Sequence, residues 1–248
     1  MTKLTTIIKV NIFLAQFVIA SGALAGETLR IATAANFILP MEKIVALFSE
    51  QTGIEVQTSY GSSGKLFAQI NQGAPYDLFL SADLERPQEL YKKGLSRAPF
   101  EYATGQVVLW STQTNLQAIT WQQALAENKG RIAIANPQTA PYGKVVATVL
   151  GELGLLKVFA KRLVYGQSVA QVFQFVETKN TVFGFVALPY ALSAKGRQGK
   201  SWPLPEVELV IQGGCQLTTG RPGQAVQLFI AFLTSDAVHL VKKEFGYL

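Results

Sequence analysis

The stretch that most constrains the fold is residues 135–144, which read Ala-Asn-Pro-Gln-Thr-Ala-Pro-Tyr-Gly-Lys. It follows residues 131–134, a short and mainly apolar strand, and precedes residues 145–150, which favour a helix. Two prolines and a glycine set the turn, and Pro141 stands near the helix start, where a missing N–H costs little. Such a turn points the free N–H groups of the next helix at one spot, which favours negative charge. The stretch therefore predicts a strand–turn–helix unit that forms one wall of an oxyanion site.

Segments typical of strands and of helices alternate along the rest of the chain. Strands are predicted at residues 29–32, 54–58, 78–80, 106–110, 132–134 and 182–186, with an extended segment at 208–211. Helices are predicted around residues 44–52 and 66–70, and at 85–93, 121–127, 145–150, 169–177, 224–233 and 236–245. This alternation favours mainly parallel sheets built from βαβ units.

We expect two α/β lobes with a ligand between them, because ligands lie beyond the carboxyl ends of such strands. The first lobe is predicted to combine residues 26–104 with residues 213–248, and the second to span residues 105–212. The chain would cross between the lobes near residues 103–105 and 212–214.

The N-terminus, residues 1–25, has the pattern of a signal peptide. Lys3 and Lys9 form a positive region, residues 10–20 are mostly apolar, and Ala-Leu-Ala at 23–25 predicts cleavage before Gly26. The alternative is an uncleaved membrane anchor, which the shortness of the apolar run disfavours. We therefore expect an exported, periplasmic protein.

Composition indicates a globular chain, since 49% of the 248 residues are apolar and 15% are charged. The formal net charge of +6 falls to +4 once the two lysines of the signal peptide are removed, which leaves 20 basic and 16 acidic side chains. The basic residues form no run, so no nucleic-acid partner is expected. The single cysteine, Cys215, excludes an internal disulfide, which is compatible with export.

Four turns ahead of predicted helices carry hydroxyl, amide or glycine residues: 35–36, 62–64, 140–143 and 166–169. Each alone resembles an ordinary helix cap, but none contains Asp, Glu, His or Cys. That absence disfavours metal and acid–base chemistry and suits a deprotonated tetrahedral dianion, which only accepts hydrogen bonds. Lys65 and Lys144 lie just downstream, and we expect them to be solvated rather than to bind the anion directly.

The chain resembles a known family through motifs that occur in order. They are 34–37 (Ala-Ala-Asn-Phe), 61–64 (Gly-Ser-Ser-Gly), 74–83 (Ala-Pro-Tyr-Asp-Leu-Phe-Leu-Ser-Ala-Asp), 136–143 (Asn-Pro-Gln-Thr-Ala-Pro-Tyr-Gly), 184–187 (Gly-Phe-Val-Ala) and 245–247 (Phe-Gly-Tyr). This set, which covers nearly all of the chain after residue 26, resembles the periplasmic molybdate-binding proteins of ABC transporters. The resemblance implies a two-lobed, class II periplasmic binding-protein fold that closes on molybdate or tungstate and docks on a membrane permease.

The resemblance also implies which residues bind the anion. In the first lobe these are Asn36 and Ser63, with Ala35 beside them; in the second they are the backbone N–H groups of Tyr142 and Val169. Molybdenum would be present only as bound molybdate on these same residues. We expect a monomer that needs no other cofactor.

Two positions depart from the family pattern. Some members place a tyrosine hydroxyl on the anion from the segment at 184–187, where this chain has Ala187 and its next tyrosine is Tyr190. Asn36 stands where a serine is common.

An enzyme is the alternative from another class, but no catalytic triad is apparent. Residues 61–64 lack the G-x-S-x-G pattern of a nucleophile elbow. The only histidine, His239, lies in the predicted final helix, where a surface or packing role is expected, and Cys215 has no histidine neighbour in the sequence.

Another oxyanion is the alternative within the binding proteins. Protonated phosphate would need an acidic acceptor, and an organic acid would usually need an arginine fork, neither of which occurs in the four turns. Sulfate has the same charge as molybdate and is smaller, so the radius of the pocket must separate these two.

Overall fold

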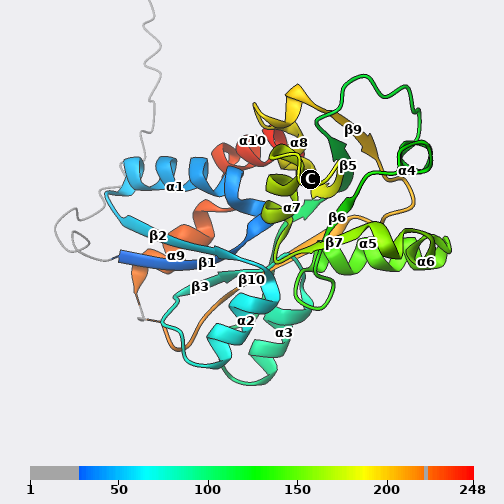
Figure 1. Cartoon of the computed structure of the whole chain (residues 1–248). Coiled ribbons are helices and arrows are strands. Elements are labelled where there is room, and N and C mark those ends of the chain that lie inside the picture. Colours follow the sequence, from blue (N-terminus) through cyan, green and yellow to red (C-terminus); the bar gives the residue numbers. More distant parts are fainter. Residues whose placement is uncertain (1–27, 221–222) are drawn as a thin grey trace, which may run out of the picture.

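The computed structural model describes residues 28–220 and 223–248, which form two α/β lobes (Figure 1). The first lobe is built on a sheet with the strand order β2 (Glu55–Gly61), β1 (Thr28–Ala34), β3 (Leu78–Leu80), β10 (Val210–Gln216), β4 (Phe100–Gly105). The second lobe is built on a sheet with the order β7 (Leu163–Gly166), β6 (Ile132–Ala135), β8 (Phe183–Ala187), β5 (Val107–Ser111), β9 (Lys200–Pro203). The predicted two-lobed α/β architecture is confirmed, whereas the predicted signal peptide at residues 1–25 lies outside the described residues.

Helices cover both faces of each sheet. Those of the first lobe are α1 (Ile38–Thr52), α2 (Ser63–Asn71), α3 (Glu85–Lys92), α9 (Gln224–Phe232) and α10 (Asp236–Glu244). Those of the second are α4 (Trp121–Glu127), α5 (Pro141–Glu152), α6 (Leu155–Phe159), α7 (Val169–Glu177) and α8 (Leu188–Leu192). Three 3-10 turns complete the described elements: η1 (Ala35–Phe37), which leads directly into α1, η2 (Ala160–Arg162) and η3 (Gly196–Gln198).

The sheets are mixed, whereas the sequence predicted mainly parallel sheets. Strand β1 pairs in parallel with β2 and β3, and β6 pairs in parallel with β7 and β8, as βαβ units require. By contrast, β10 is antiparallel to β3 and β4, and β5 is antiparallel to β8 and β9. Strands β5 and β10 are those that the chain enters after crossing between the lobes, and they alone run opposite to the other described strands of their sheets.

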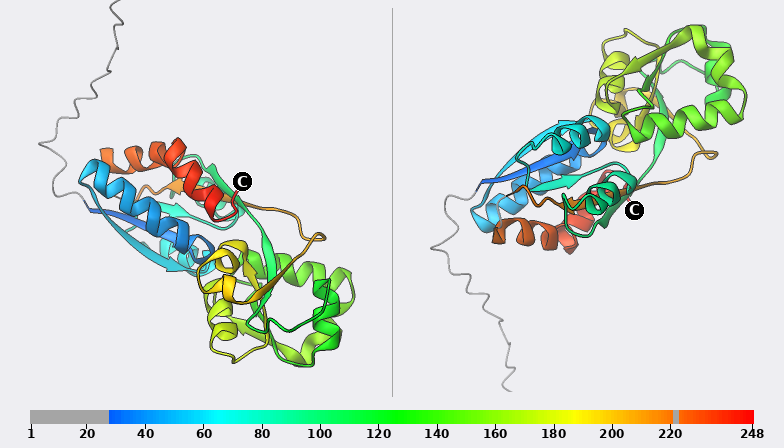
Figure 2. Two further views of the ribbon diagram at one scale, coloured as in Figure 1. Left: turned by 90° about the horizontal axis from the view of Figure 1, so that it is seen from above. Right: turned by 90° about the horizontal axis from the view of Figure 1, so that it is seen from below.

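The lobes are joined by two crossings of the chain, seen clearly in Figure 2. Only Gln106 separates β4 from β5, so the chain runs almost directly from one sheet into the other. It returns from β9 to β10 through residues 204–209.

The sequence missed β4, β7 and β9 as strands, because these segments are short or interrupted by polar residues, glycine and proline.

Apolar packing fixes the position of the sheets and their helices. In the first lobe, α1, α9 and α10 bury side chains such as Phe48 and Phe229 on one face of the sheet, with ring centroids 4.9 Å apart. Helices α2 and α3 cover the other face, where Cys215 is also buried. The second lobe has its own core, which also takes in Ala34 and Ala82 from the first lobe. The two lobes are therefore packed against each other along the ends of β1 and β3.

Among the described residues, no single helix is long and apolar enough to cross a membrane. Helices α9 and α10 are long and apolar enough only when they are taken together, and they are bent by 58° at their junction.

Candidate anion-binding site between the two lobes

A small cavity lies where the two lobes meet. Both lobes contribute to its wall, which consists of Ala34, Ala35, Asn36, Ser62, Ser63, Ala82, Ala140, Pro141, Tyr142, Ser168 and Val169. The cavity is small, with a volume of about 10 Å³, roughly what a single water molecule needs. The structure brings together all five residues that the sequence predicted as ligands: Ala35, Asn36, Ser63, Tyr142 and Val169.

The cavity is built from four strand–turn–helix units of the same kind. Strands β1 and β2 end at the cavity and are followed by η1–α1 and α2; in the second lobe, β6 and β7 are followed by α5 and α7. In each lobe the two strands are parallel neighbours, so their carboxyl ends lie side by side. The N-terminal ends of the following helices are thereby gathered around one point, as in other α/β ligand sites.

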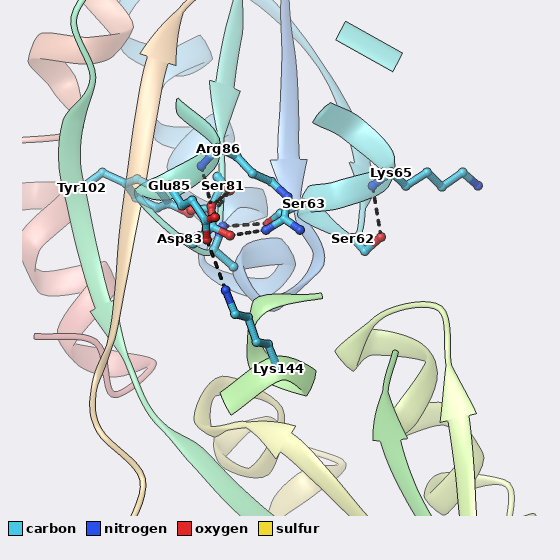
Figure 3. A network of polar contacts seen from close by, with 10 residues as sticks. Ser62, Ser63, Lys65, Ser81, Asp83, Glu85, Arg86, Tyr102 and Lys144 are labelled. Carbon is cyan, nitrogen blue, oxygen red and sulfur yellow. Dashed lines mark hydrogen bonds and ion pairs between the residues drawn. The ribbon is translucent and has the colours of Figure 1, made fainter. Parts of the chain in front are cut away.

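Ser63 is the side chain best placed to donate a hydrogen bond into the cavity. It is 1% exposed, and its Oγ accepts a hydrogen bond of 2.9 Å from the backbone N–H of Ala82. Because this bond uses the oxygen as acceptor, the hydroxyl hydrogen can point to a ligand. The neighbouring Ser62 instead caps α2, accepting from the N–H of Lys65 at 3.4 Å (Figure 3).

Asn36 is buried in the cavity wall, but its side-chain amide is engaged elsewhere. The Nδ2 group donates to Gln212 Oε1 at 2.7 Å and to the Tyr247 hydroxyl at 3.1 Å. These bonds use both hydrogens of the amide nitrogen. Any donor that Asn36 offers to an anion would therefore be its main-chain N–H, in the turn that leads into α1.

In the second lobe, the cavity is lined by the N-terminal ends of α5 and α7. Helix α5 begins at Pro141, so Tyr142 lies in its first turn. No side chain caps this helix. Helix α7 begins at Val169, and the side chain of Ser168 caps it by accepting from the N–H of Gln171 at 3.3 Å. N–H groups in a first turn have no intrahelical partner, and the helix dipole makes this end positive.

No residue that lines the cavity, within the described chain, carries a charged side chain. Lys65 and Lys144 are exposed, and the Nζ of Lys144 lies 3.3 Å from Glu85 across the lobe boundary (Figure 3). Asp83 forms an ion pair with Arg86 and does not line the cavity. Nor does the described part of the chain hold a group of three or more His, Cys, Asp or Glu placed to bind a metal ion. Backbone and hydroxyl dipoles therefore dominate the field in the cavity.

Contacts between the lobes enclose the cavity. The N–H of Gly64 donates to the carbonyl of Thr139 at 2.8 Å, and a Cβ on Gly64 would lie only 2.8 Å from that oxygen. The hydroxyl of Tyr190 donates to the carbonyl of Ala35 at 2.6 Å. The arrangement is thus a closed one, in which backbone groups of both lobes are in direct contact.

Tyr190 bears on the departure noted at Ala187. Its ring stacks on Phe173, with centroids 5.1 Å apart, and its hydroxyl is bonded to Ala35 rather than placed in the cavity wall. Burial raises the pKa of Tyr190, so the hydroxyl stays protonated and remains a donor. It holds the backbone beside the cavity from the opposite lobe.

Sequence reasoning overlooked some residues in and behind the cavity. Ala82 follows β3 and lines the wall, and the available signals were its position after a strand and its place in the motif at residues 74–83. Gln212 and Tyr247 lie behind Asn36 and are separated from it by 176 and 211 residues. No local pattern in the sequence indicates such pairings.

Comparison with known proteins shows to which family this chain belongs. The family model for bacterial extracellular solute-binding proteins matches residues 29–248. The chain therefore belongs to the bacterial extracellular solute-binding protein family.

Individual relatives make the relationship more specific. The molybdate-binding protein ModA of Azotobacter vinelandii is 38% identical over 236 residues, covering 92% of each chain. ModA of Rhodobacter capsulatus is 36% identical over 242 residues, covering 92% of this chain and 91% of that protein. The solved structure of the A. vinelandii periplasmic molybdate-binding protein matches with a TM-score of 0.84 and 35% identity, covering 89% of this chain and 98% of the other. The resemblance seen in the sequence motifs is confirmed, as is the two-lobed, class II binding-protein fold that it implies.

Proposed function

We propose that this protein captures molybdate, and with it tungstate, outside the cytoplasm and delivers it to the permease of an ABC transporter. One observation carries the proposal: a small cavity without charged side chains is lined by the N-terminal ends of helices from both lobes. Such a site matches a compact dianion, which needs many donors and no proton acceptor. The relatives named molybdate-binding proteins support this choice of anion.

The proposed ligand set joins one hydroxyl to several backbone groups. Ser63 donates through Oγ, and Asn36, Tyr142 and Val169 donate through main-chain N–H groups, with Ala35 lining the wall beside them. Preorganised dipoles of this kind stabilise an anion without a buried counter-charge, so the site is uncharged when empty. Molybdenum would enter and leave only as part of the oxyanion.

Capture by closure follows from the split of the donors between the lobes. An open form would expose either half of the donor set, and closure would add the other half and exclude water. The closed form would then present one continuous surface across both lobes, which a permease can distinguish from the open form. The membership in an extracellular binding-protein family supports delivery from the periplasm.

The test is calorimetric titration of the mature chain, residues 26–248, with molybdate, tungstate, sulfate and phosphate in turn. Tight one-to-one binding of molybdate and tungstate, with little heat from the other two, is the expected result. Tight binding of sulfate or phosphate would keep the donor-lined cavity but contradict the proposed anion.

A further inference from the structure

Gln212 lies at the crossing between the lobes and is completely buried. It sits in β10, and the pairing of β10 with β4 shifts register between Gln212 and Gly213. A bulge of this kind re-aims the adjacent side chain and is common beside functional sites. The extra residue lies in β4, where Tyr102 has no partner in the register, and its hydroxyl donates to Gln212.

Its amide bonds to both lobes. The Oε1 atom accepts from Asn36 Nδ2 at 2.7 Å and from the Tyr102 hydroxyl at 2.9 Å, both in the first lobe. The Nε2 group donates to the hydroxyl of Tyr142, in the second lobe, at 3.3 Å. We propose the main-chain N–H of Tyr142 as an anion donor. The backbone of Tyr142 therefore lies at the cavity, while its side-chain hydroxyl contacts Gln212.

Tyr247, which directly precedes Leu248, completes this buried cluster. Its hydroxyl donates to the Asn36 carbonyl at 2.8 Å and accepts from Asn36 Nδ2 at 3.1 Å. Asn36 is thus held through its side chain and through its backbone. We call Asn36, Tyr102, Tyr142, Gln212 and Tyr247 the crossing cluster.

We propose that Gln212 is a positioning residue that couples lobe closure to anion binding, by holding Asn36 of one lobe and Tyr142 of the other in the arrangement that the anion requires. This inference rests on the proposed function, because it assigns a role to Gln212 at that same site. Gln212 itself does not line the cavity and does not touch the anion.

The cost of burying the cluster supports a specific role. Five buried polar side chains would destabilise the molecule unless their hydrogen bonds are made, and apolar residues would pack there at lower risk. The Gln212–Tyr142 bond joins the lobes, so separation of the lobes would break it and leave buried polar groups short of partners. The bond therefore favours the closed form, as the anion does, and the two effects add.

The cluster is also insensitive to pH in the physiological range. Burial raises the pKa of Tyr102, Tyr142 and Tyr247, so all three hydroxyls stay protonated and uncharged. No negative charge forms behind a cavity that is meant to hold a dianion.

The test compares Gln212→Met with a matched control on the same strand. Met is close to Gln in volume and removes all three hydrogen bonds. Gln216→Met replaces another buried glutamine of β10. Gln216 does not line the cavity, and its hydrogen-bond partner, Gln227, is in the same lobe. Affinity for molybdate is measured by calorimetry, and closure by small-angle scattering with and without molybdate.

Molybdate binding by the wild-type protein is measured first, since its absence would contradict the proposed function and not the role of Gln212. Given wild-type binding, Gln212→Met should raise the Kd about tenfold or more. It should also raise the molybdate concentration that is needed for compaction, and Gln216→Met should change neither. A Kd for Gln212→Met equal to that of wild type, even with a lower Tm, would show a merely structural role and overturn the proposal.

A double-mutant cycle with Tyr142→Phe tests the proposed partner. This variant removes one hydroxyl, leaves the backbone N–H in place, and provides the test even if Gln212→Met does not fold. Tyr142→Phe should also raise the Kd, and the double variant should be little weaker than the weaker single variant. Unchanged affinity in Tyr142→Phe, or additive losses in the double variant, would overturn the coupling of Gln212 to Tyr142.

Discussion

Ser63 shows how one side chain can be committed to the fold and remain available to a ligand. Its oxygen accepts from the N–H of Ala82, and its hydrogen is left for the cavity. Asn36 shows the reverse, since its amide hydrogens are used within the crossing cluster. Both residues were predicted as ligands from the motif resemblance, but the sequence gives no sign that they would act through different atoms. That difference depends on partners far away in the chain.

Replacing Ser63 by Ala should weaken molybdate binding by about 1–3 kcal/mol, because a charge-assisted hydrogen bond is lost. Calorimetric titration measures the effect. Ser235→Ala is the control, since Ser235 caps α10 by accepting from the N–H of Val238, away from the cavity. The control should lower thermal stability and leave the affinity unchanged. An unaltered affinity in Ser63→Ala would rule this hydroxyl out as a ligand.

Val169→Pro tests a backbone donor directly, because proline removes the N–H and keeps the helix. Val169 is the first residue of α7, a position that proline tolerates, and Ser168 before it is extended, with ψ 168°. The affinity for molybdate should fall by about 1.5–3 kcal/mol, the contribution of a hydrogen bond to a charged group.

The matched control for this substitution is Asp236→Pro, at the first residue of α10, where the preceding Ser235 is also extended, with ψ 156°. Both variants are titrated with molybdate under identical conditions. Equal affinities in the two variants would mean that the Val169 N–H does not reach the anion.

At the scale of elements, the strand–turn–helix units were the most predictable part of the site. Turn residues such as Ser62, Ser63 and Pro141 have strong local preferences, so the sequence indicates where the helices begin. The absence of acidic residues from these turns was equally visible. The crossing cluster was not predictable, because its hydrogen bonds join residues of β4, β10, α5 and the C-terminus that have no common local pattern.

The crossing strand β4 ends at Gly105, where the backbone packs against the crossing cluster. A Cβ on Gly105 would lie 2.1 Å from the Tyr142 hydroxyl and 2.7 Å from Gln212 Nε2. Gly105→Ala should therefore displace Tyr142 and weaken molybdate binding by at least ~1 kcal/mol, as overpacking usually costs.

Gly151→Ala is the control for this variant, because a Cβ at Gly151, in α5, meets no atom within 4 Å. It should bind molybdate as the wild type does and gain slightly in stability, since alanine favours a helix over glycine. Titration of both variants decides the point. Wild-type affinity in Gly105→Ala would contradict the close packing described here.

At the scale of the whole molecule, the sequence predicted two lobes with a ligand between them, and the alternation of strands and helices was sufficient for that. It did not predict that β5 in one sheet and β10 in the other each run antiparallel to their neighbours. Strand direction in a sheet depends on which end the chain enters, and this is decided by the crossings rather than by the composition of a strand. The closed arrangement likewise depends on contacts between lobes, such as Gly64 with Thr139.

Cys215 offers a probe of how firmly the molecule is held together. It is fully buried in the first lobe, and burial raises the pKa of its thiol to about 11. The folded protein should therefore react very slowly with a thiol reagent at pH 8, because both access and the thiolate are lacking. Labelling should become fast in denaturant, where the thiol regains its ordinary pKa.

Saturating molybdate should slow this labelling further, since a ligand that binds only the folded state lowers the population of open forms. The labelling rate is followed by absorbance or mass spectrometry, with and without molybdate. Rapid labelling of the native protein would contradict the buried position of Cys215. A rate that molybdate does not change would show that the thiol opens independently of the anion site.

The most direct test of the central claim is a crystal structure of residues 26–248 grown with molybdate, with anomalous data collected at the molybdenum absorption edge. Our account predicts one strong anomalous peak in the cavity between the lobes, with oxygens in hydrogen-bond distance of Ser63 Oγ and of the backbone N–H groups of Tyr142 and Val169. A cavity without molybdenum, or molybdenum held at surface lysines such as Lys65 or Lys144, would contradict it.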